Sequence, residues 1–234
     1  MVKVFVAVTC ALMALKILCM LAWVHLPPFH VFVYVVLTIL MLVSYAGTVF
    51  ILPSFPVGML ADDSSDAVDG KEDDDPLEEA RYCEKCDRAK PEGYHHCSVC
   101  GQCISHMDHH CPWTGNCVGL RTKKLFILFL LYTSLACLWF AYCVVFVTPH
   151  GARGAVLFTT VVLATLIGFL LLGYFGFHVY LLAHGQTTLD FLARRAGTSH
   201  AGFHHNLQVY FGPNWWAYPV PLVPACLWAP SSSH

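Results

Sequence analysis

Four long apolar stretches limit what this chain can fold into. A helix that crosses the hydrocarbon core of a bilayer needs about 20 mostly apolar residues. Four windows of the sequence reach that length: 4–24, 31–52, 125–148 and 155–183. The last three contain no Asp, Glu, Lys or Arg. We therefore predict an all-α membrane protein with four transmembrane helices.

The composition also indicates a membrane protein. The 234 residues are 57% hydrophobic and 12% charged, whereas a soluble domain carries about 25% charged residues. This excludes a single soluble globule, and it excludes disorder, which needs few apolar residues and high charge. The first window could instead be a cleaved signal peptide, but it is longer than the apolar region of such a peptide and no small-residue cleavage site ends it.

The first window holds one charged residue, Lys16. A lysine in a membrane helix can extend its ammonium group to the membrane surface. Alternatively, it can face a cavity inside the helix bundle. We favour extension to the surface, and the cavity remains the open alternative.

The basic residues predict how the chain is oriented. Cytoplasmic loops of membrane proteins carry an excess of Lys and Arg. The turn after the first window has neither, and the loop at 149–154 has one, Arg153. We therefore expect the N-terminus, the segment 53–124 and the tail after the fourth window to face the cytosol. The basic residues of the segment and the tail are Lys71, Arg81, Lys85, Arg88, Lys90, Arg121, Lys123, Lys124, Arg194 and Arg195.

The segment between the second and third windows changes character part-way. Residues 61–80 contain ten acidic residues and one lysine, which is typical of a solvated linker. We expect helices 1 and 2 in 1–60, an acidic cytosolic linker in 61–80, and a small cysteine-rich zinc domain in 81–124. Helices 3 and 4 follow in 125–183, and a cytosolic tail in 184–234.

The cysteine-rich segment predicts metal binding. The cytosol is reducing, so clustered Cys and His there bind metal more often than they form disulfides. Pairs with C-x₂-C spacing occur at 83/86 and 97/100, and each pair can offer two thiolates to one tetrahedral zinc. Metal binding would also supply the folding free energy that so short a segment lacks. Seven of the twelve cysteines lie here: Cys83, Cys86, Cys97, Cys100, Cys103, Cys111 and Cys117.

Two tetrahedral zinc ions need eight ligands. Six cysteines and two histidines would supply them and leave one cysteine over. Cys111 directly follows Asp108, His109 and His110. A thiol beside a histidine with a carboxylate behind it matches an activated nucleophile, but the same run could equally consist of metal ligands and spacers. Spacing alone leaves both open. The candidate histidines are His95, His96, His106, His109 and His110.

This segment resembles the cysteine-rich domain of the DHHC family of protein S-acyltransferases. It contains CxxC, Lys90-Pro91, HHCxxC, DHHCPW at 108–113 and NCVG at 116–119, followed by Phe126. The plan of two spans, a cytosolic domain, two spans and a tail is also the family's. The sequence QTTLD at 186–190 resembles the family's TTxE motif, and residues 205–212 resemble its C-terminal Asn-and-aromatic motif.

The resemblance implies roles for individual residues. It implies that Cys111 is the nucleophile, His109 the general base, Asp108 its orienter and Thr188 a support for Asp108. It also implies two structural zinc ions. The first would bind Cys83, Cys86, His96 and Cys103, and the second Cys97, Cys100, His110 and Cys117.

The expected reaction is transfer of a long-chain acyl group, palmitoyl, from acyl-CoA to Cys111 and then to cysteines of membrane-associated proteins. We expect a ping-pong mechanism, a lipid bilayer as surroundings and no nucleic-acid partner. For acyl-CoA contacts we expect Lys90, Arg121 and Trp113. Lys123 and Lys124 are also candidates for the CoA phosphates, but we favour a position that flanks the membrane near anionic lipid. Golgi or ER is the expected location rather than the plasma membrane.

Departures from the family pattern keep a second function open, a catalytically idle, zinc-stabilised membrane adaptor. These departures are Gly93, Thr122, Asp190 and a missing DPG motif at 53–58, and we expect none of them to touch a zinc ligand or the Asp-His-Cys group. A membrane ubiquitin ligase is disfavoured, because no final C-x₂-C pair completes the block at 83–117.

Ser134 and Ala136 are small residues that would leave space for long acyl chains if they face an acyl cavity.

Overall fold

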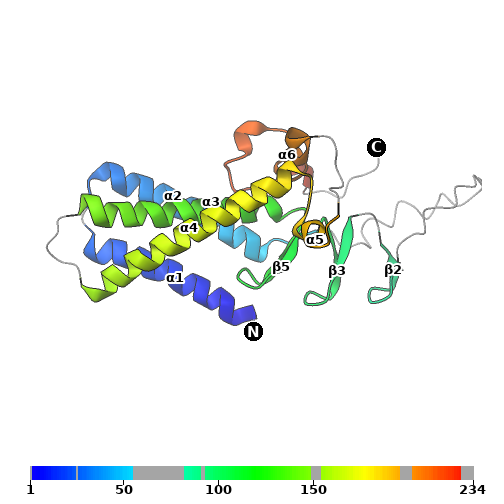
Figure 1. Ribbon diagram of the computed structural model, residues 1–234, viewed down its shortest axis with the longest axis horizontal. Coiled ribbons are helices and arrows are strands. Elements are labelled where there is room, and N and C mark those ends of the chain that lie inside the picture. The colour runs from blue at the N-terminus through cyan, green and yellow to red at the C-terminus, as the bar shows by residue number, and fades with distance from the viewer. Residues whose placement is uncertain are drawn as a thin grey trace, which may run out of the picture.

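The computed structural model describes residues 2–24, 26–54, 82–90, 93–148, 154–195 and 202–227. The acidic linker at 61–80 and most of the motif position at 53–58 lie outside these residues. Figure 1 shows long helices side by side along the longest axis, with short hairpins and the tail gathered at one end.

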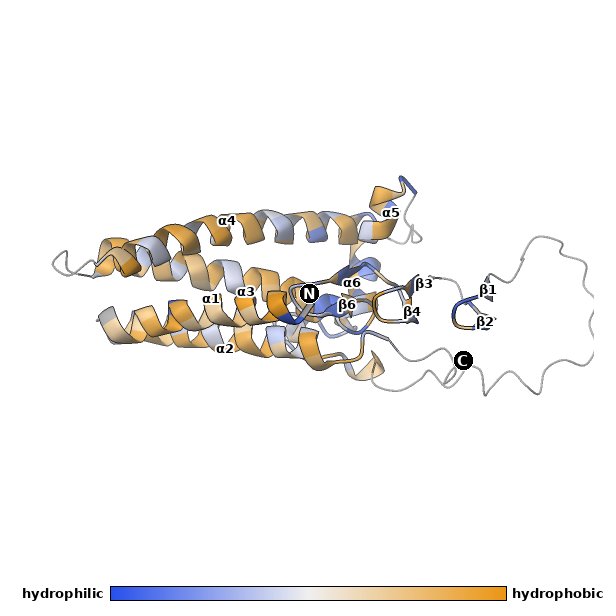
Figure 2. Cartoon of the chain, turned by 90° about the horizontal axis from the view of Figure 1, so that it is seen from below, coloured by the Kyte–Doolittle hydropathy of each residue, from blue (hydrophilic) through white to orange (hydrophobic). Residues whose placement is uncertain are grey.

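Four helices are long and apolar enough to cross a membrane, as predicted. They are α1 (Val2–Trp23), α2 (Pro28–Phe50), α3 (Lys123–Tyr142) and α4 (Ala155–Ala183). A π-helical turn, η2 (Cys143–Val147), extends α3. Apolar residues make up most of these helices (Figure 2), which is typical of helices that contact both a core and lipid. The chain is therefore a multi-pass membrane protein.

Helix α3 forms the centre of the bundle and packs against both α2 and α4. Most of its side chains are buried, whereas many side chains of the other three helices are exposed on the outside of the bundle. Glycine permits the close approach of the neighbours. A Cβ atom at Gly168 of α4 would lie 2.9 Å from Leu138 Cδ2, and one at Gly47 of α2 would lie 2.8 Å from Leu125 Cδ1. Small residues serve the same purpose in membrane bundles generally.

The cysteine-rich segment between α2 and α3 forms three antiparallel hairpins. Such short strands bury little apolar surface, so they were not apparent from the sequence pattern. The fold class is confirmed: the protein is mostly helical, with a cysteine-rich region between helices 2 and 3 that can bind metal. The strand pairs are β1 (Tyr82–Cys83) with β2 (Arg88–Ala89), β3 (Tyr94–Cys97) with β4 (Gln102–Ser105), and β5 (His109–Cys111) with β6 (Asn116–Val118).

The tail returns to the end of the bundle that carries the hairpins (Figure 1). It forms the short helix α5 (Thr188–Leu192), then α6 (Phe203–Phe211), and two 3-10 turns, η3 (Trp215–Ala217) and η4 (Ala225–Leu227). Helix α6 packs against α3 and α4. Its buried Tyr210 and Phe211 join the same apolar cluster as residues of α1, α2 and α3, so the tail is part of the folded bundle.

Candidate active site and metal clusters

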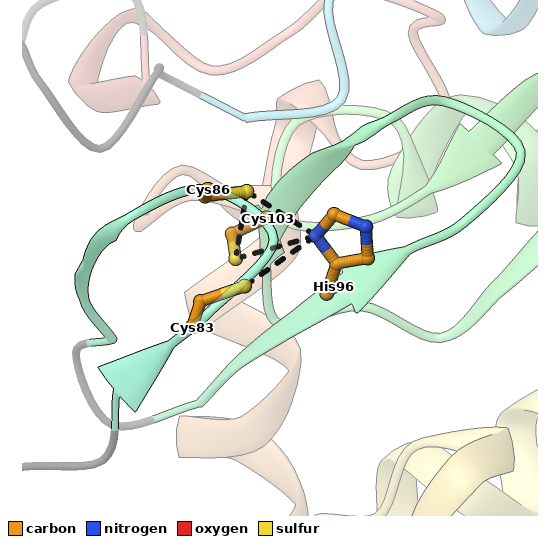
Figure 3. A group of neighbouring side chains, drawn as sticks. All are labelled: Cys83, Cys86, His96 and Cys103. Atoms are coloured by element: carbon orange, nitrogen blue, oxygen red, sulfur yellow. Dashed lines mark hydrogen bonds between the residues drawn. The ribbon is translucent and has the colours of Figure 1, made fainter.

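The first candidate metal group joins two hairpins. Cys83 ends β1 and Cys86 lies in the turn between β1 and β2, while His96 and Cys103 lie directly opposite each other on β3 and β4. Figure 3 shows the three sulfurs gathered around the His96 ring. His96 Nδ1 lies 3.5, 3.2 and 4.0 Å from the sulfurs of Cys83, Cys86 and Cys103. A tetrahedral zinc with Zn–S of about 2.3 Å and Zn–N of about 2.0 Å places its ligands about 3.5–3.8 Å apart, so this group fits zinc.

The second group repeats the arrangement one hairpin later. Cys97 ends β3 and Cys100 lies in the turn between β3 and β4, and His110 and Cys117 lie opposite each other on β5 and β6. The His110 Nδ1 lies 3.7, 3.4 and 3.5 Å from the sulfurs of Cys97, Cys100 and Cys117. Each group therefore takes a turn from one hairpin and a cross-strand pair from the next. Two ions bound in this way would tie the three hairpins together in series.

Cys111 lies outside both metal groups. It is the last residue of β5 and is 4% exposed, packed with Val118, Phe126 and Leu130. Burial raises the pKa of the Cys111 thiol, but hydrogen bonding to His109 and the charge of that ring lower the pKa by more, so the net shift is downward. A lowered thiol pKa increases the thiolate fraction, and the thiolate is the nucleophile.

His109 is held by a buried carboxylate. Its Nδ1 donates a hydrogen bond to Asp108 Oδ2 at 2.8 Å, and Asp108 is fully buried. Burial lowers the pKa of His109, but the bond to Asp108 and the neighbouring Cys111 raise it more, to about 9. For Asp108, burial raises the pKa, while Lys123 and His109 lower it more, well below its usual range. These directions favour a charged imidazolium beside a thiolate.

Asp108 receives further donors from two distant segments. Thr188 of α5 donates its backbone N–H to Oδ1 at 3.1 Å and its hydroxyl to Oδ2 at 2.5 Å. Lys123, the first residue of α3, places its Nζ 2.9 Å from Oδ1. The pair of Asp108 and His109 therefore lies where a hairpin, a membrane helix and the tail meet. A carboxylate bound on both oxygens has a fixed orientation, and so does the ring that it binds.

The structure overturns the expectation that Lys123 and Lys124 flank the membrane. Both side chains are buried, with exposed fractions of 0% and 2%. Lys123 Nζ contacts Asp108 and lies 4.6 Å from the centre of the Tyr210 ring, while Lys124 Nζ donates to the carbonyl of Ala217 at 2.9 Å. Position beside an apolar window suggested lipid contact, but a buried carboxylate requires a counter-charge, and Lys123 supplies it.

An apolar cavity of about 950 Å³ opens beside Cys111 and extends between the membrane helices. Its volume is at the upper end of the range for small-molecule sites. His109, Cys111 and Trp113 line one end, and apolar side chains of α1, α3 and α4 line most of the remainder. Ser134 and Ala136 are buried but do not belong to the lining, so the idea that they leave space in the cavity is wrong; Thr133 and Cys137 of the same helix line it instead.

Comparison with known proteins now identifies the family. A family model described as DHHC palmitoyltransferase matches residues 77–195, which is 119 of the 234 residues. The chain belongs to the DHHC palmitoyltransferase family. Palmitoyltransferase pfa3 of Neurospora crassa is 41% identical over 127 residues, covering 50% of this chain and 20% of that protein.

Two vertebrate members of the DHHC family are also similar. Palmitoyltransferase ZDHHC15 of Xenopus laevis is 37% identical over 157 residues, 60% of this chain and 46% of that protein. Palmitoyltransferase ZDHHC20 of Homo sapiens is 34% identical over 119 residues, 47% of this chain and 32% of that protein. The matches therefore span less than half of these relatives' own lengths.

One departure from the DHHC pattern, Thr122, contacts a proposed zinc-ligand residue, contrary to expectation, and a second, Asp190, stabilises the turn beside the site. Asp190 forms a reciprocal capping box with Thr187 at the start of α5, with its Oδ2 accepting from the Thr187 backbone N–H at 3.0 Å. This box fixes the turn that presents Thr188. The hydroxyl of Thr122 donates to the carbonyl of Cys117 at 2.9 Å and accepts from the Gly119 N–H at 3.0 Å. Asp190 and Thr122 differ from the residues usual in the family, but both still make local hydrogen bonds near the site.

The residues expected to contact acyl-CoA are not brought together. Trp113 lines the cavity, and its carbonyl accepts from the Tyr45 hydroxyl at 3.1 Å. Lys90 directly follows β2, the strand farthest from the helices in Figure 1. Arg121 is 6% exposed, and its backbone N–H donates to the carbonyl of Pro53 at 3.0 Å. Neither Lys90 nor Arg121 lines the cavity.

Proposed function

We propose that this chain is a protein-cysteine S-acyltransferase that uses acyl-CoA. It would move a long-chain acyl group, palmitoyl in the first instance, to Cys111 and then to cysteines of membrane-associated proteins. One observation carries the proposal: the thiol left outside both metal groups lies beside a carboxylate-bound histidine and lines a large apolar cavity. Each methylene that the acyl chain buries there would contribute about 0.8 kcal/mol to binding.

In the first step His109 accepts the proton of the Cys111 thiol. The thiolate attacks the carbonyl carbon of the acyl thioester, a new bond forms to Cys111 Sγ, and the bond to the CoA sulfur breaks. The departing CoA thiolate takes the proton from His109. Asp108 keeps the ring oriented and stabilises its charged form, as carboxylates do in related triads.

The second step repeats the exchange with a protein cysteine as acceptor. The incoming thiol gives its proton to His109 and attacks the acyl-Cys111 thioester, and the Cys111 thiolate leaves. One thioester replaces another in both steps, so the driving force is small and positioning supplies most of the rate enhancement. Trp113, at the same end of the cavity as Cys111, is the residue that we propose for contact with the acyl thioester.

We propose that both metals are structural zinc ions, the first held by Cys83, Cys86, His96 and Cys103 and the second by Cys97, Cys100, His110 and Cys117. Both ligand sets are complete, which is typical of structural rather than catalytic zinc. The eight side chains would then hold the hairpins, and with them residues 108–111, in place. Such rigid support is what a catalytic group on a segment with little core requires.

The hairpin end of the molecule would face the cytosol, because that end carries most of the lysines and arginines. The proposed division remains helices 1 and 2 in 1–60, linker 61–80, zinc domain 81–124, helices 3 and 4 in 125–183 and tail 184–234. We propose an endomembrane, Golgi or ER, as the location. The acyl-CoA head group would stay in cytosolic water at the mouth of the cavity.

The test is incubation of the purified protein with labelled palmitoyl-CoA. Label should appear at Cys111, and hydroxylamine should remove it, because hydroxylamine cleaves thioesters. Cys111→Ser should fold and acquire no thioester label. A wild-type protein that binds zinc and stays unlabelled would contradict the proposal and favour the idle adaptor.

A further inference from the structure

Lys16 lies inside the bundle, not at its surface. Its exposed fraction is 4%, so the favoured expectation that it reaches the membrane surface is wrong and the cavity alternative is right. The side chain lines the same cavity that opens beside Cys111. Its Nζ lies 3.8 Å from the sulfur of Met41 and 5.8 Å from the centre of the Tyr34 ring. A thioether and an aromatic face are weak partners for an ammonium group.

The surrounding helices offer Lys16 no counter-charge. The windows 4–24, 31–52, 125–148 and 155–183 contain no Asp or Glu, and the carboxylate that pairs with a buried lysine elsewhere, Asp108, is taken by Lys123. A charged side chain inside a membrane protein is costly and usually pairs with another group or with a substrate. A ligand bound in the cavity could supply such a partner.

Thr133 is a second polar residue that lines the cavity. Thr133 Oγ1 is buried and has no hydrogen-bond partner among the described residues. Cys137 follows it by about one turn on the same face of α3 and also lines the cavity. Lys16 and Thr133 therefore bring one ammonium donor and one hydroxyl to a mostly apolar chamber.

The helices indicate how far this polar site lies from the thiol. Thr9 of α1 contacts the carbonyl of Trp113 at the Cys111 end, and Lys16 follows it by about two helical turns, about 10 Å. Phe126 of α3 packs with Cys111, and Thr133 follows it by about two turns, about 10 Å. A chain attached to Cys111 would therefore meet Lys16 with its middle or distal part, not with its thioester.

We propose that Lys16 and Thr133 form a recognition site for an acyl chain that carries oxygen, as a hydroxyl, keto or carboxylate group, on its distal half. An unsubstituted chain would leave Thr133 Oγ1 without a hydrogen-bond partner and Lys16 with only the Met41 sulfur and the Tyr34 ring. An oxygen at that depth would accept hydrogen bonds from the ammonium and the hydroxyl together. The inference rests on the proposed acyl transfer, and it names the class of acyl donor that the same cavity would take.

Binding of non-transferable analogues tests the inference apart from catalysis. S-hexadecyl-CoA is a thioether with no carbonyl to attack, and it would be compared with thioethers hydroxylated at successive positions along the distal half of the chain. The full chain in detergent should bind the best hydroxylated compound at least about tenfold more tightly than S-hexadecyl-CoA, which corresponds to about one additional charge-assisted hydrogen bond.

Three variants show whether Lys16 causes the difference. Lys16→Met should remove the preference and bring the two affinities together, and Thr133→Val should reduce it part-way. Lys3→Met, a matched charge removal on the exposed side of the same helix, should keep it. Melting temperatures would show that each variant is folded; Met should be tolerated, because replacing a buried charge by an apolar residue is often neutral.

Equal affinities in the wild type, or a preference that survives in folded Lys16→Met, would overturn the inference. The outcome is separable from that of the proposed function. Failure of palmitoyl-CoA to label Cys111 would contradict the proposed transferase function, while the preference among the thioethers could still hold. Normal labelling without a Lys16-dependent preference would leave the transferase and remove the inference.

Discussion

Lys123 Nζ lies 2.9 Å from Asp108 Oδ1, and both side chains are completely buried. This ion pair joins the first residue of a membrane helix to the residue that orients His109. Tyr210 of the tail helix covers the same ammonium group. The catalytic geometry that we propose therefore depends on the correct docking of α3 and α6, and not on the hairpins alone.

The first prediction concerns this ion pair. Lys123→Met should leave Asp108 buried without its counter-charge, which costs about 3–5 kcal/mol when one partner of a buried pair is removed. The rate of Cys111 acylation should fall by about 10- to 100-fold, because a misplaced base loses part of the usual general-base contribution of about 10²–10⁴. Labelling reactions stopped at successive times measure the acylation rate, and thermal melts measure the loss of stability.

Lys124→Met is the matched control, because Lys124 is buried beside Lys123 but donates to Ala217 and not to Asp108. It should lower the melting temperature without a comparable loss of acylation rate per folded molecule. If both variants slow acylation equally, the ion pair with Asp108 has no special role.

The second prediction concerns Thr188. Thr188→Val removes the hydroxyl bond to Asp108 but keeps the backbone N–H bond. A hydrogen bond to a charged group contributes about 1.5–3 kcal/mol, so we expect roughly a tenfold or greater drop in acylation rate with both zinc ions retained. Thr159→Val, which removes an exposed hydroxyl from α4, should change nothing measurable, and an unchanged rate in Thr188→Val would contradict the assigned support.

The third prediction concerns Asn116, which faces Cys111 across the β5–β6 hairpin. Its amide donates to the carbonyls of Thr48 at 3.0 Å and Ile51 at 2.8 Å, at the C-terminal end of α2. Carbonyls at helix ends lack partners within the helix. Asn116→Ala should therefore loosen the hairpin from α2 and slow acylation, while zinc content stays at two. Hydrogen exchange at β5 and β6 should increase; unchanged exchange would show that the amide does not anchor the hairpin.

The fourth prediction separates metal ligands from the nucleophile. Cys100→Ser should reduce bound zinc from two ions to about one and make the hairpins sensitive to protease, because metal binding supplies their folding free energy. Cys111→Ser should retain two zinc ions and protease resistance. Elemental analysis of the two variants, prepared in parallel, gives the comparison, and zinc loss in Cys111→Ser would mean that the ligand assignment is wrong.

The sequence predicted the parts of the fold that depend on local composition. Window hydropathy is a local property, so four helices were expected close to their observed positions, and 155–183 matches α4 residue for residue. The three hairpins were not expected, because strands as short as Asn116–Val118 lack a periodic apolar pattern and take their geometry from the turns and metal groups around them.

Side-chain placement depends on packing that a sequence window cannot show. Lys16 and Lys123 both lie in or beside apolar windows, and the sequence suggested contact with the membrane surface for each. In the structure one lines a cavity and the other neutralises a carboxylate. Thr188 was assigned only through the family resemblance, since eighty residues separate it from Asp108.

The most direct test of the central claim is the intact mass of the acylated protein under conditions that retain bound metal. The claim is that Cys111 reacts while the eight Cys and His ligands, which do not include Cys111, hold two zinc ions. After reaction with palmitoyl-CoA, single molecules should carry two zinc ions and one acyl group together. An acyl group found only on molecules that have lost a zinc ion would contradict the claim, because the reacting thiol would then be a metal ligand.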